Sequence, residues 1–459
     1  MFNQANIHQA IAVLKQQFGE RLSTSKSVRE HHAHTTTRIP NQPPDAVIFV
    51  ETTYEISSIM RVCQETRCPV IAFGTGSSLE GHVNAPFGGI SIDMSKLDRV
   101  LAVNQEDLDA VVQPGVTRES LNSHLRDSGL FFPIDPGANA SLGGMAATRA
   151  SGTNAVRYGT MKDNILGMEV VTADGRIIRI GTRARKSSAG YDLTRIFIGS
   201  EGTLGIITEL TVRLQGIPEM IGGGICSFPS IRAACDAVIM TVQMGIPVAR
   251  IEMLDPLQVR ACNRYSKLEL PEEPLLLVEF HGSPDSVADD ARRFTEICSE
   301  FSNTPLRWSS DPEERNKLWK ARHDAYWASL ALIPGATGVA TDVCVPISRL
   351  ADCVEQTIAD IAKSGLTAPI VGHVGDGNFH VLPLSMPDDA QMQERISAFS
   401  SRLTKRALAL GGTCTGEHGI GQGKQTYLRD EMGDAIEIMQ AIKTTMDPAN
   451  ILNPGKLFI

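Results

Sequence analysis

The spacing of hydrophobic positions predicts alternating helices and strands along most of the chain. Ile7, Ile11, Leu14 and Phe18 recur at helical spacing near the start. The run DAVIFVE, a helix near residues 54–66 and the run PVIAF then predict strand, helix and strand. After a helix expected near residues 117–128, MEVVTADGRIIRIG predicts a hairpin that turns at Asp174–Gly175, followed by a strand in GTLGIITELTVRL.

The second half of the chain repeats this alternation with longer elements. Strands are expected in GGGICSF, VARIEML and LLLVEFHG, with helices near residues 230–244, 284–301 and 388–410. This pattern is typical of an α+β layer with an antiparallel sheet. A chain of 459 residues also exceeds what one hydrophobic core usually organises. We therefore expect domains at residues 1–217 and 218–412, and a C-terminal segment at 413–459.

Charge and apolar runs exclude several classes of protein. The net charge is −9 and no basic stripe is present, so nucleic-acid binding is not expected. No stretch approaches the roughly 20 apolar residues that cross a bilayer, which excludes a transmembrane segment and allows only peripheral attachment. The first helix lacks the features of a targeting signal. We expect the protein in the cytoplasm, with peripheral attachment to the inner face of the membrane as an alternative.

Cysteine and histidine positions outside the main motifs suggest structural roles. The nine cysteines are scattered without a C-x-x-C pair, which predicts buried, reduced thiols. His31, His32 and His34 lie close together in a Thr-rich polar stretch. Without companion ligands they are interpreted as residues of a solvated loop rather than as a metal site.

GHVGDGNFH and TGEHGIG contain the residues best suited to metal chemistry. His373 and His380 flank a glycine-rich turn, so we expect a strand–turn–strand hairpin that brings both imidazoles together. With the carboxylate of Glu417 they form a ligand set for zinc or manganese, with iron as a third choice, and leave a position for substrate oxygen. His418 is the candidate base. The alternative is that each histidine is only a hydrogen-bonded turn residue.

Two segments are suited to binding a cofactor. Small residues dominate residues 133–159, and the glycine turn GTGSS, residues 74–78, directly follows an expected strand. Such backbone can approach a cofactor closely and direct N–H groups at a phosphate. The third glycine of a Rossmann fingerprint is replaced by Leu79, which disfavours a nicotinamide site. GEHGIGQGK fails as a P-loop, since His418 replaces its first glycine and Gln425 its final Ser or Thr.

Seven motifs in order resemble one enzyme family over nearly the whole chain. They are PVIAFGTGSSLEGHV, QPGV, PIDPGANASLGGMAATRASGTNAVRYG, GSEGTLGIITELTVRL, GHVGDGNFH, TGEHGIG and MDPANILNPGKLF. This order closely resembles the FAD-linked D-2-hydroxyacid dehydrogenases of the vanillyl-alcohol-oxidase fold, nearest to the cytochrome-type D-lactate dehydrogenases and glycolate oxidase FAD subunits. The resemblance implies a PCMH-type FAD-binding domain of two subdomains, then an α+β cap domain that binds substrate. It also implies that the C-terminal segment returns to the FAD domain.

The resemblance also assigns cofactor residues. It implies that the glycine turn holds the FAD pyrophosphate, that residues 136–159 line the dinucleotide and flavin, that residues 201–207 approach the adenine, and that the C-terminus approaches the flavin. The positions that match are Gly74, Thr75, Gly76, Ser77, Ser78, Pro136, Gly137, Ser141, Gly143, Gly144, Ser151, Gly152, Tyr158, Gly159, Glu201, Gly202, Ile207 and Asn453. Some relatives attach FAD through a histidine in the turn. Ser77 and Ser78 stand there in this chain, which predicts noncovalent FAD, although His82 lies nearby.

The expected reaction is oxidation of a 2-hydroxy acid. Metal binding would acidify the substrate hydroxyl, His418 would take its proton, and a hydride would pass from Cα to flavin N5. The resemblance implies that Arg322 grips the substrate carboxylate, while Asn378 could hydrogen-bond the substrate or merely cap its loop. Relatives that use 2-hydroxyglutarate carry a lysine where Ala340 and Thr341 stand.

That missing lysine favours D-lactate over a dicarboxylate, as do the small or apolar residues Leu332, Ile333 and Val339. The alternatives are glycolate, D-2-hydroxyglutarate, a flavin oxidase that uses oxygen, or a noncatalytic flavin subunit. The electron acceptor could be a quinone, a cytochrome or an electron-transferring flavoprotein. The oligomeric state stays open, with a homodimer allowed.

Overall fold

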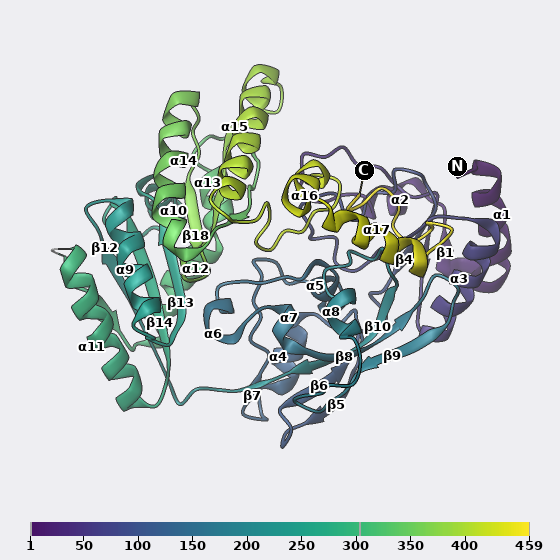
Figure 1. Cartoon of the computed structure of the whole chain (residues 1–459), viewed down its shortest axis with the longest axis horizontal. Coiled ribbons are helices and arrows are strands. Elements are labelled where there is room, and N and C mark those ends of the chain that lie inside the picture. Colours follow the sequence, from purple (N-terminus) through teal and green to yellow (C-terminus); the bar gives the residue numbers. More distant parts are fainter. Residues whose placement is uncertain (1, 303, 459) are drawn as a thin grey trace. The chain divides into compact units, whose positions relative to one another are not determined.

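The computed structural model describes residues 2–302 and 304–458 and divides the chain into two compact units (Figure 1). The first unit contains the residues up to Ser151, Gly159–Ile217, and the residues from Glu417 onward. The second contains Gly152–Tyr158 and Pro218–Gly416. The boundary after residue 217 coincides with the expected one, and the other lies four residues beyond 412. The short segment Gly152–Tyr158 was not expected to leave the first unit.

The first sheet of the first unit follows the expected strand–helix–strand pattern. Its order is β1 (Leu22–Ser23), β2 (Ala46–Phe49), β4 (Ile90–Asp93) and β3 (Val70–Phe73), with β2 and β3 parallel to β4. Helix α1 (Gln4–Phe18) buries Ile7, Leu14 and Phe18 in the core cluster that also contains residues of α3 (Thr53–Thr66). The predicted amphipathic helix is thus confirmed.

The second sheet of the first unit is antiparallel. Its order is β5 (Val100–Asn104), β6 (Asp109–Val112), β10 (Ile206–Arg213), β8 (Ile165–Val171) and β9 (Ile177–Gly181). The β8–β9 hairpin turns at Asp174–Gly175 as predicted, and Gly175 has a φ of +79°, which glycine adopts at little cost. A further pair joins β7 (Leu130–Phe131) to β11 (Gln215–Gly216).

Seven antiparallel strands form the main sheet of the second unit. Their order is β15 (Arg307–Ser309), β12 (Met220–Ser227), β14 (Leu275–Gly282), β13 (Val248–Leu254), β18 (Ile370–His373), β19 (Asn378–Val381) and β17 (Val343–Cys344). Alternate residues point to opposite faces of a strand. One face carries Val278 and Phe280 into the largest core cluster, whereas Glu279 and His281 lie on the opposite face.

Helices pack against the apolar face of this sheet. Its core cluster combines side chains of four helices, which are labelled in Figure 1: α9 (Ile231–Gln243), α11 (Pro284–Phe301), α14 (Leu350–Ser364) and α15 (Ala390–Ala409). A second cluster lies among α10 (Pro256–Ser266), α12 (Pro312–His323) and α13 (Ala325–Leu330). A short pair joins β16 (Thr337–Gly338) to β20 (Leu384–Ser385).

The remaining helices are short or close to the C-terminus. They are η1 (Gly19–Arg21), α2 (Lys26–His31), α4 (Arg118–Leu125), α5 (Leu142–Thr148), α6 (Ala155–Tyr158), α7 (Met161–Asn164), α8 (Leu193–Phe197), η2 (Ile347–Arg349), η3 (Val374–Asp376), α16 (Gln425–Met432) and α17 (Ala435–Met446). Beyond α17, Leu452 forms a parallel bridge with Val70, so the C-terminal segment returns to the first sheet of the first unit.

The interpretation of the histidine cluster as a solvated loop is wrong for His32. This side chain is 2% exposed and its Nε2 lies 2.9 Å from Oδ2 of Asp93, while Nδ1 lies 2.7 Å from the carbonyl of Val28. Both ring nitrogens of His32 therefore lie within hydrogen-bond distance of an oxygen. Its ring also packs on Phe73, 4.3 Å between centroids. The predicted burial of the cysteines holds for eight of nine, with Cys344 half-buried, and all nine are free.

Candidate functional site

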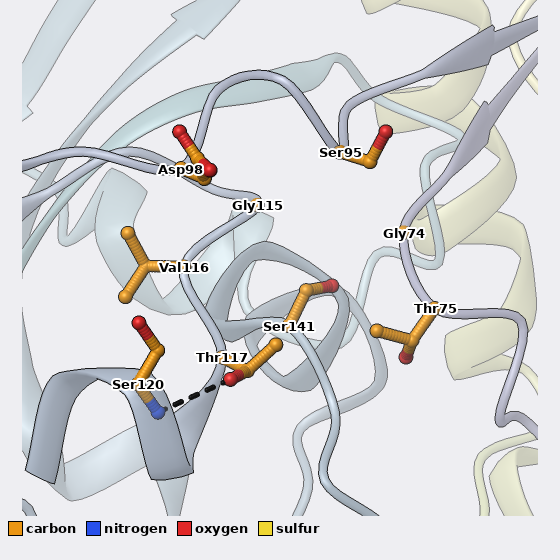
Figure 2. Close-up of a pocket in the computed structure, with 9 residues that line it drawn as sticks. All are labelled: Gly74, Thr75, Ser95, Asp98, Gly115, Val116, Thr117, Ser120 and Ser141. Atoms are coloured by element: carbon orange, nitrogen blue, oxygen red, sulfur yellow. Dashed lines mark hydrogen bonds between the residues drawn. The ribbon is translucent and has the colours of Figure 1, made fainter. Parts of the chain in front are cut away.

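A cavity of about 270 Å³ opens beside the glycine turn in the first unit (Figure 2). Gly74 and Thr75 follow β3 directly and line it together with Ser141. The opposite wall comes from Ser95 and Asp98 and from the start of α4, where Thr117 Oγ1 accepts a hydrogen bond from the Ser120 backbone. Three of the predicted cofactor residues thus share one cavity.

Close backbone approach at this cavity explains its small residues. A Cβ on Gly74 would lie 2.3 Å from Oγ of Ser141, and one on Gly143 would lie 2.5 Å from Cβ of Pro114. Gly76 has a φ of +67°, which favours glycine. Among the described residues, the buried hydroxyls of Ser78 and Ser141 have no hydrogen-bond partner. Buried hydroxyls normally have one, so these oxygens fit an added ligand such as the FAD pyrophosphate.

The rest of the predicted dinucleotide segment has mixed placement. Gly137 is exposed, Gly143 and Gly144 lie in α5, and Ser151 is half-buried at the end of its stretch of the first unit. Gly152 and Tyr158 belong to the second unit, where the Tyr158 hydroxyl lies 2.7 Å from Nδ1 of His281. The predicted small-residue wall is therefore partly helical.

Glu201 holds the loop that carries the candidate base. This residue is 5% exposed, and its carboxylate accepts backbone hydrogen bonds from Ile420 at 2.7 Å and Gly421 at 2.8 Å. His82 Nε2 lies 3.2 Å from the same carboxylate. Burial alone would raise the pKa of the Glu201 carboxyl, but His82 and the two backbone N–H groups outweigh it and lower the pKa. The side chain of Glu201 thus fixes the loop just after His418.

The C-terminal segment reinforces this loop from the other side. Asn453 donates from Nδ2 to the carbonyl of Glu201 at 2.7 Å, and Leu457 donates its N–H to the carbonyl of Gly421. Lys456 is 3% exposed and donates to the carbonyl of Asn84 at 2.7 Å. Burial lowers the pKa of Lys456 to about 7. Gly202 adjoins Glu201, and Ile207 is buried on β10, so neither forms part of this polar network.

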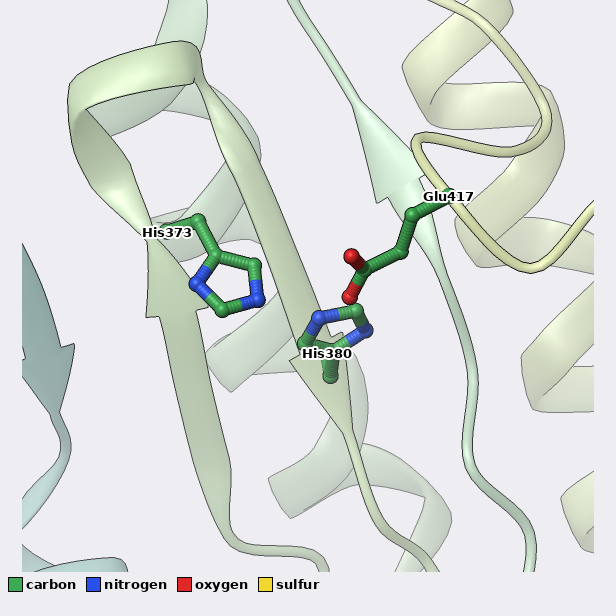
Figure 3. A group of neighbouring side chains, drawn as sticks. All are labelled: His373, His380 and Glu417. Atoms are coloured by element: carbon green, nitrogen blue, oxygen red, sulfur yellow. The ribbon is translucent and has the colours of Figure 1, made fainter. Parts of the chain in front are cut away.

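His373, His380 and Glu417 come together as the sequence predicts (Figure 3). His373 is the last residue of β18, and His380 lies within β19. The two strands pair in the expected hairpin around η3 and Gly377. One ligand atom from each of the three residues lies within 4.8 Å of the others. Metal–ligand bonds measure about 2.0–2.2 Å, so a small adjustment would let one ion reach all three. The donor set of two imidazoles and a carboxylate fits zinc or manganese.

Glu417 is covalently joined to a tightly packed stretch. A Cβ on Gly416 would lie 2.2 Å from Nδ2 of Asn378, which leaves room only for glycine. Just before it, Thr415 donates from Oγ1 to Oδ2 of Asp342 at 2.7 Å, and Thr413 bridges with Cys344. The backbone that leads into Glu417 is therefore held beside the histidine hairpin.

Each imidazole of the cluster presents Nε2 because its Nδ1 has another partner. His373 Nδ1 lies 2.6 Å from Oε1 of Glu252, and His380 Nδ1 lies 3.0 Å from the carbonyl of Thr341. Such partners fix the tautomer and ring orientation of metal-binding histidines. The rings meet edge to face with centroids 5.4 Å apart. This arrangement is the one expected of ligands that bind through Nε2.

Arg322 lies next to the cluster but already has a partner. On α12 it is 9% exposed, and it donates to Oε2 of Glu252 from Nε at 2.7 Å, with Nη2 at 2.5 Å from the same oxygen. The Nε edge of the guanidinium is therefore used within the protein. A substrate carboxylate would have to meet the other end of the group, Nη1 and the second hydrogen of Nη2.

Asn378 has a structural role in addition to any contact with substrate. Its Nδ2 donates to Oδ1 of Asp342 and to the carbonyl of Val343, both at 2.8 Å. The amide nitrogen is thus used to tie the hairpin to β17 (Val343–Cys344) and the residue before it. A substrate contact by Asn378 would have to involve its oxygen, Oδ1, as an acceptor.

Sequence reasoning missed two buried carboxylates. Glu252 is 0% exposed and Asp342 is 1% exposed, and each supports a predicted site residue through the bonds above. The signal for Glu252 was present in VARIEML, where an acid alternates with apolar residues in a strand that is otherwise buried. An acid in such a position needs a partner.

Comparisons with known proteins follow the same division of the chain. The family described as "FAD binding domain" matches residues 44–181, and "FAD linked oxidases, C-terminal domain" matches residues 217–457. The chain is 50% identical to "Probable D-lactate dehydrogenase, mitochondrial" of Danio rerio, over 95% of this chain and 89% of that protein. It is 42% identical to "D-lactate dehydrogenase [cytochrome], mitochondrial" of Arabidopsis thaliana, over 97% and 79%.

Further relatives widen the range of names. The "Glycolate oxidase subunit GlcD" of Bacillus subtilis (strain 168) is 35% identical, over 96% of this chain and 94% of that protein. Among solved structures, p-cresol methylhydroxylase with bound substrate gives a TM-score of 0.82 at 16% identity, covering 100% of this chain and 98% of that one. At that identity the likeness shows the fold alone, and it confirms the expected PCMH-type architecture.

One further observation concerns membranes. Within residues 2–302 and 304–458, no helix is both long and apolar enough to pass through a bilayer. The names of several relatives include "mitochondrial", so a cytoplasmic location is not confirmed.

Proposed function

Because the chain belongs to the family of FAD-linked oxidases that includes the D-lactate dehydrogenases, we propose that it oxidises D-lactate to pyruvate with the help of FAD and a divalent metal. The observation that carries the proposal is the convergence of His373, His380 and Glu417, with each histidine held at Nδ1 so that Nε2 can ligate. Zinc and manganese suit this donor set best.

The reaction removes a hydride from Cα of lactate and a proton from its hydroxyl, which leaves the C2 carbonyl of pyruvate. When bound, FAD would accept the hydride, and the metal would lower the pKa of the hydroxyl. His418 would accept the hydroxyl proton, since an imidazole can do so near neutral pH. Arg322 would hold the substrate carboxylate through Nη1 and Nη2, because its Nε edge is occupied by Glu252.

Binding of FAD is proposed to be noncovalent and to use the cavity beside Gly74 and Thr75. Its support is the buried hydroxyl of Ser141, which lines that cavity, and the buried hydroxyl of Ser78 in the same glycine turn as Gly74 and Thr75; both can donate to the pyrophosphate. His82 lies beside the Glu201 carboxylate and is 6% exposed, so it is engaged elsewhere. Loss of the yellow colour from acid-precipitated protein would support noncovalent binding.

The electrons are proposed to pass to a cytochrome rather than to NAD. Several relatives carry "cytochrome" in their names, and Leu79 stands where a nicotinamide fingerprint needs its third glycine. A quinone or an electron-transferring flavoprotein would be served by the same flavin chemistry. We also propose that the chain can form a homodimer and can attach peripherally to a membrane.

Anaerobic flavin reduction tests the proposal directly. D-lactate should bleach the flavin band of the purified protein, L-lactate should not, and removal of metal with a chelator should slow the bleaching until Zn²⁺ or Mn²⁺ is restored. Glycolate belongs in the same series, because of the glycolate oxidase subunit among the relatives. Full-rate reduction after chelation would refute the role of the metal, and faster bleaching by glycolate would change the substrate.

A further inference from the structure

Glu252 is a buried carboxylate that contacts two predicted site residues at once. It lies on β13 and is 0% exposed. Its Oε1 lies 2.6 Å from Nδ1 of His373, and its Oε2 accepts from Nε of Arg322 at 2.7 Å. The metal ligand is 121 residues and the arginine 70 residues away along the chain. One side chain therefore joins the predicted metal ligand to the predicted substrate-binding cation.

The geometry at Glu252 fixes which way the His373 ring faces. Nδ1 of His373 lies 2.6 Å from Oε1 of Glu252, and Nε and Nη2 of Arg322 both lie against Oε2. Because Nδ1 is directed at the carboxylate, Nε2 is the nitrogen that faces His380 and Glu417 (Figure 3).

A simple role in folding would account for the ion pair but not for its geometry. The second unit contains a comparable buried carboxylate, Glu279 on the neighbouring strand β14, which lies 2.7 Å from His281. There the carboxylate contacts Nε2 of the imidazole, and Nδ1 meets the hydroxyl of Tyr158. Of these two pairs, the Glu252 pair is the one whose imidazole belongs to a group of three residues with ligand atoms within 4.8 Å of one another.

We propose that Glu252 is a positioning residue that orients His373 for the metal and Arg322 for the substrate carboxylate. This inference rests on the proposed function above. It extends that function by making one buried carboxylate responsible for the alignment of two groups that act on different ends of the substrate. Neither His373 nor Arg322 would keep its orientation if the carboxylate lost its charge or moved.

A Glu252→Gln substitution separates shape from charge. The amide keeps the volume of the side chain but offers one acceptor oxygen where the carboxylate offers two, and its NH₂ would face a donor on either His373 or Arg322. The conflict is relieved if His373 shifts its proton to Nε2, which removes the ligand nitrogen. The metal affinity should fall even where the fold is kept.

The test is the Zn²⁺ affinity of the full-length, FAD-loaded protein, measured by competition with a chromogenic chelator. Glu252→Gln should weaken Zn²⁺ binding about 10- to 100-fold, the usual effect of removing a carboxylate that supports a ligand histidine. Glu279→Gln is the matched control, because it breaks an equally buried carboxylate–imidazole pair of the same unit. It should leave the Zn²⁺ affinity within about threefold of the wild type.

Glu252→Asp provides a second variant if the glutamine variant does not fold. It keeps the charge but shortens the side chain, so it cannot hold both partners, and the Zn²⁺ affinity should fall about tenfold. Unchanged affinity in a folded Glu252 variant, or an equal loss in Glu279→Gln, would overturn the positioning role while leaving the metal site intact. A different result would refute the proposed metal site itself: the wild type binds no Zn²⁺, or His373→Ala binds Zn²⁺ as tightly as the wild type. In that case the inference about Glu252 fails as well.

Discussion

Two buried carboxylate–imidazole pairs in the second unit differ in the nitrogen that each carboxylate contacts. Glu252 lies 2.6 Å from Nδ1 of His373, and Glu279 lies 2.7 Å from Nε2 of His281. The second nitrogen of His281 meets the hydroxyl of Tyr158 at 2.7 Å. That of His373 lies in a cluster with two other ligand residues. The same pair of residue types thus supports a proposed metal ligand in one place and an internal hydrogen-bond chain in the other.

The two pairs also differ in their arginines. Arg322 contacts Glu252 through two nitrogens at 2.5 and 2.7 Å. Around Glu279, the nearest nitrogens of Arg250 and Arg315 lie at 3.7 and 3.9 Å. Close contact from two guanidinium nitrogens restricts rotation as well as balancing charge. The tighter pair is the one whose arginine has a predicted role in substrate binding.

The largest difference between the two pairs is expected when His373 and His281 are each replaced by alanine in separate variants. His373→Ala deletes a proposed ligand, so Zn²⁺ affinity should fall more than about 100-fold, beyond the loss expected from changing a supporting residue. Flavin reduction by D-lactate should fall with it. His281→Ala should change Zn²⁺ affinity less than about threefold. Chelator competition and stopped-flow absorbance measure both quantities, and equal losses in the two variants would contradict the distinction.

Substitution of the arginines should have the next largest effect. Arg322→Lys removes the planar group that contacts Glu252 and is proposed to hold the substrate carboxylate. The KM for D-lactate should therefore rise about 10- to 100-fold, as expected from loss of charge-assisted hydrogen bonds worth about 1.5–3 kcal/mol. Arg315→Lys, which loses a bond to the carbonyl of Ile221, is the comparison and should leave KM nearly unchanged. Steady-state kinetics with an artificial dye acceptor decide between them.

Loss of the Tyr158 hydroxyl should affect stability modestly. Tyr158→Phe removes the hydrogen bond to His281, which should lower the free energy of unfolding by about 1 kcal/mol. The Zn²⁺ affinity should not change, because this chain of contacts does not include a proposed ligand. Urea unfolding followed by circular dichroism gives the first value. A change in Zn²⁺ affinity would show that the two pairs are coupled.

The smallest expected effect is on acid stability. Burial alone would raise the pKa of the Glu279 carboxyl, but His281 and the nearby arginines outweigh it and lower the pKa. A lowered pKa means that the unfolded state binds more protons, so this stabilisation is present above the ordinary pKa and is lost as the pH falls through the folded value. Wild type and Glu279→Gln should therefore unfold at different urea concentrations at about pH 5, and this difference should become smaller as the pH is lowered to about 3. A constant difference would contradict this reasoning.

Local patterns in the sequence were sufficient for most elements. The hairpin that carries His373 and His380 was predictable because Gly375, Asp376 and Gly377 permit a tight turn between two β-rich runs. Helix α5 was missed because its sequence, LGGMAAT, is rich in glycine, and tertiary packing overrides the low helix propensity of that residue.

The partners of the supporting carboxylates could not be predicted because they are distant in sequence. Glu252 reaches His373 across 121 residues, and Glu201 reaches Gly421 across 220. Periodicity reports which face of an element is buried, but it does not report which strands become neighbours. His32 illustrates the same limit, since its partner Asp93 is 61 residues away and nothing local distinguishes it from the exposed His31 and His34.

The bridge between Val70 and Leu452 bears on the order in which the protein can be completed during synthesis. The strand that precedes the glycine turn is made early, but its neighbour is among the last residues, and Asn453 contacts a carbonyl 371 residues before it. A ribosome adds about 5–20 residues per second, so this edge of the first sheet waits tens of seconds for its partner. The second unit is made in full during that interval. Val70 and Leu452 can therefore pair only after the whole second unit has been made.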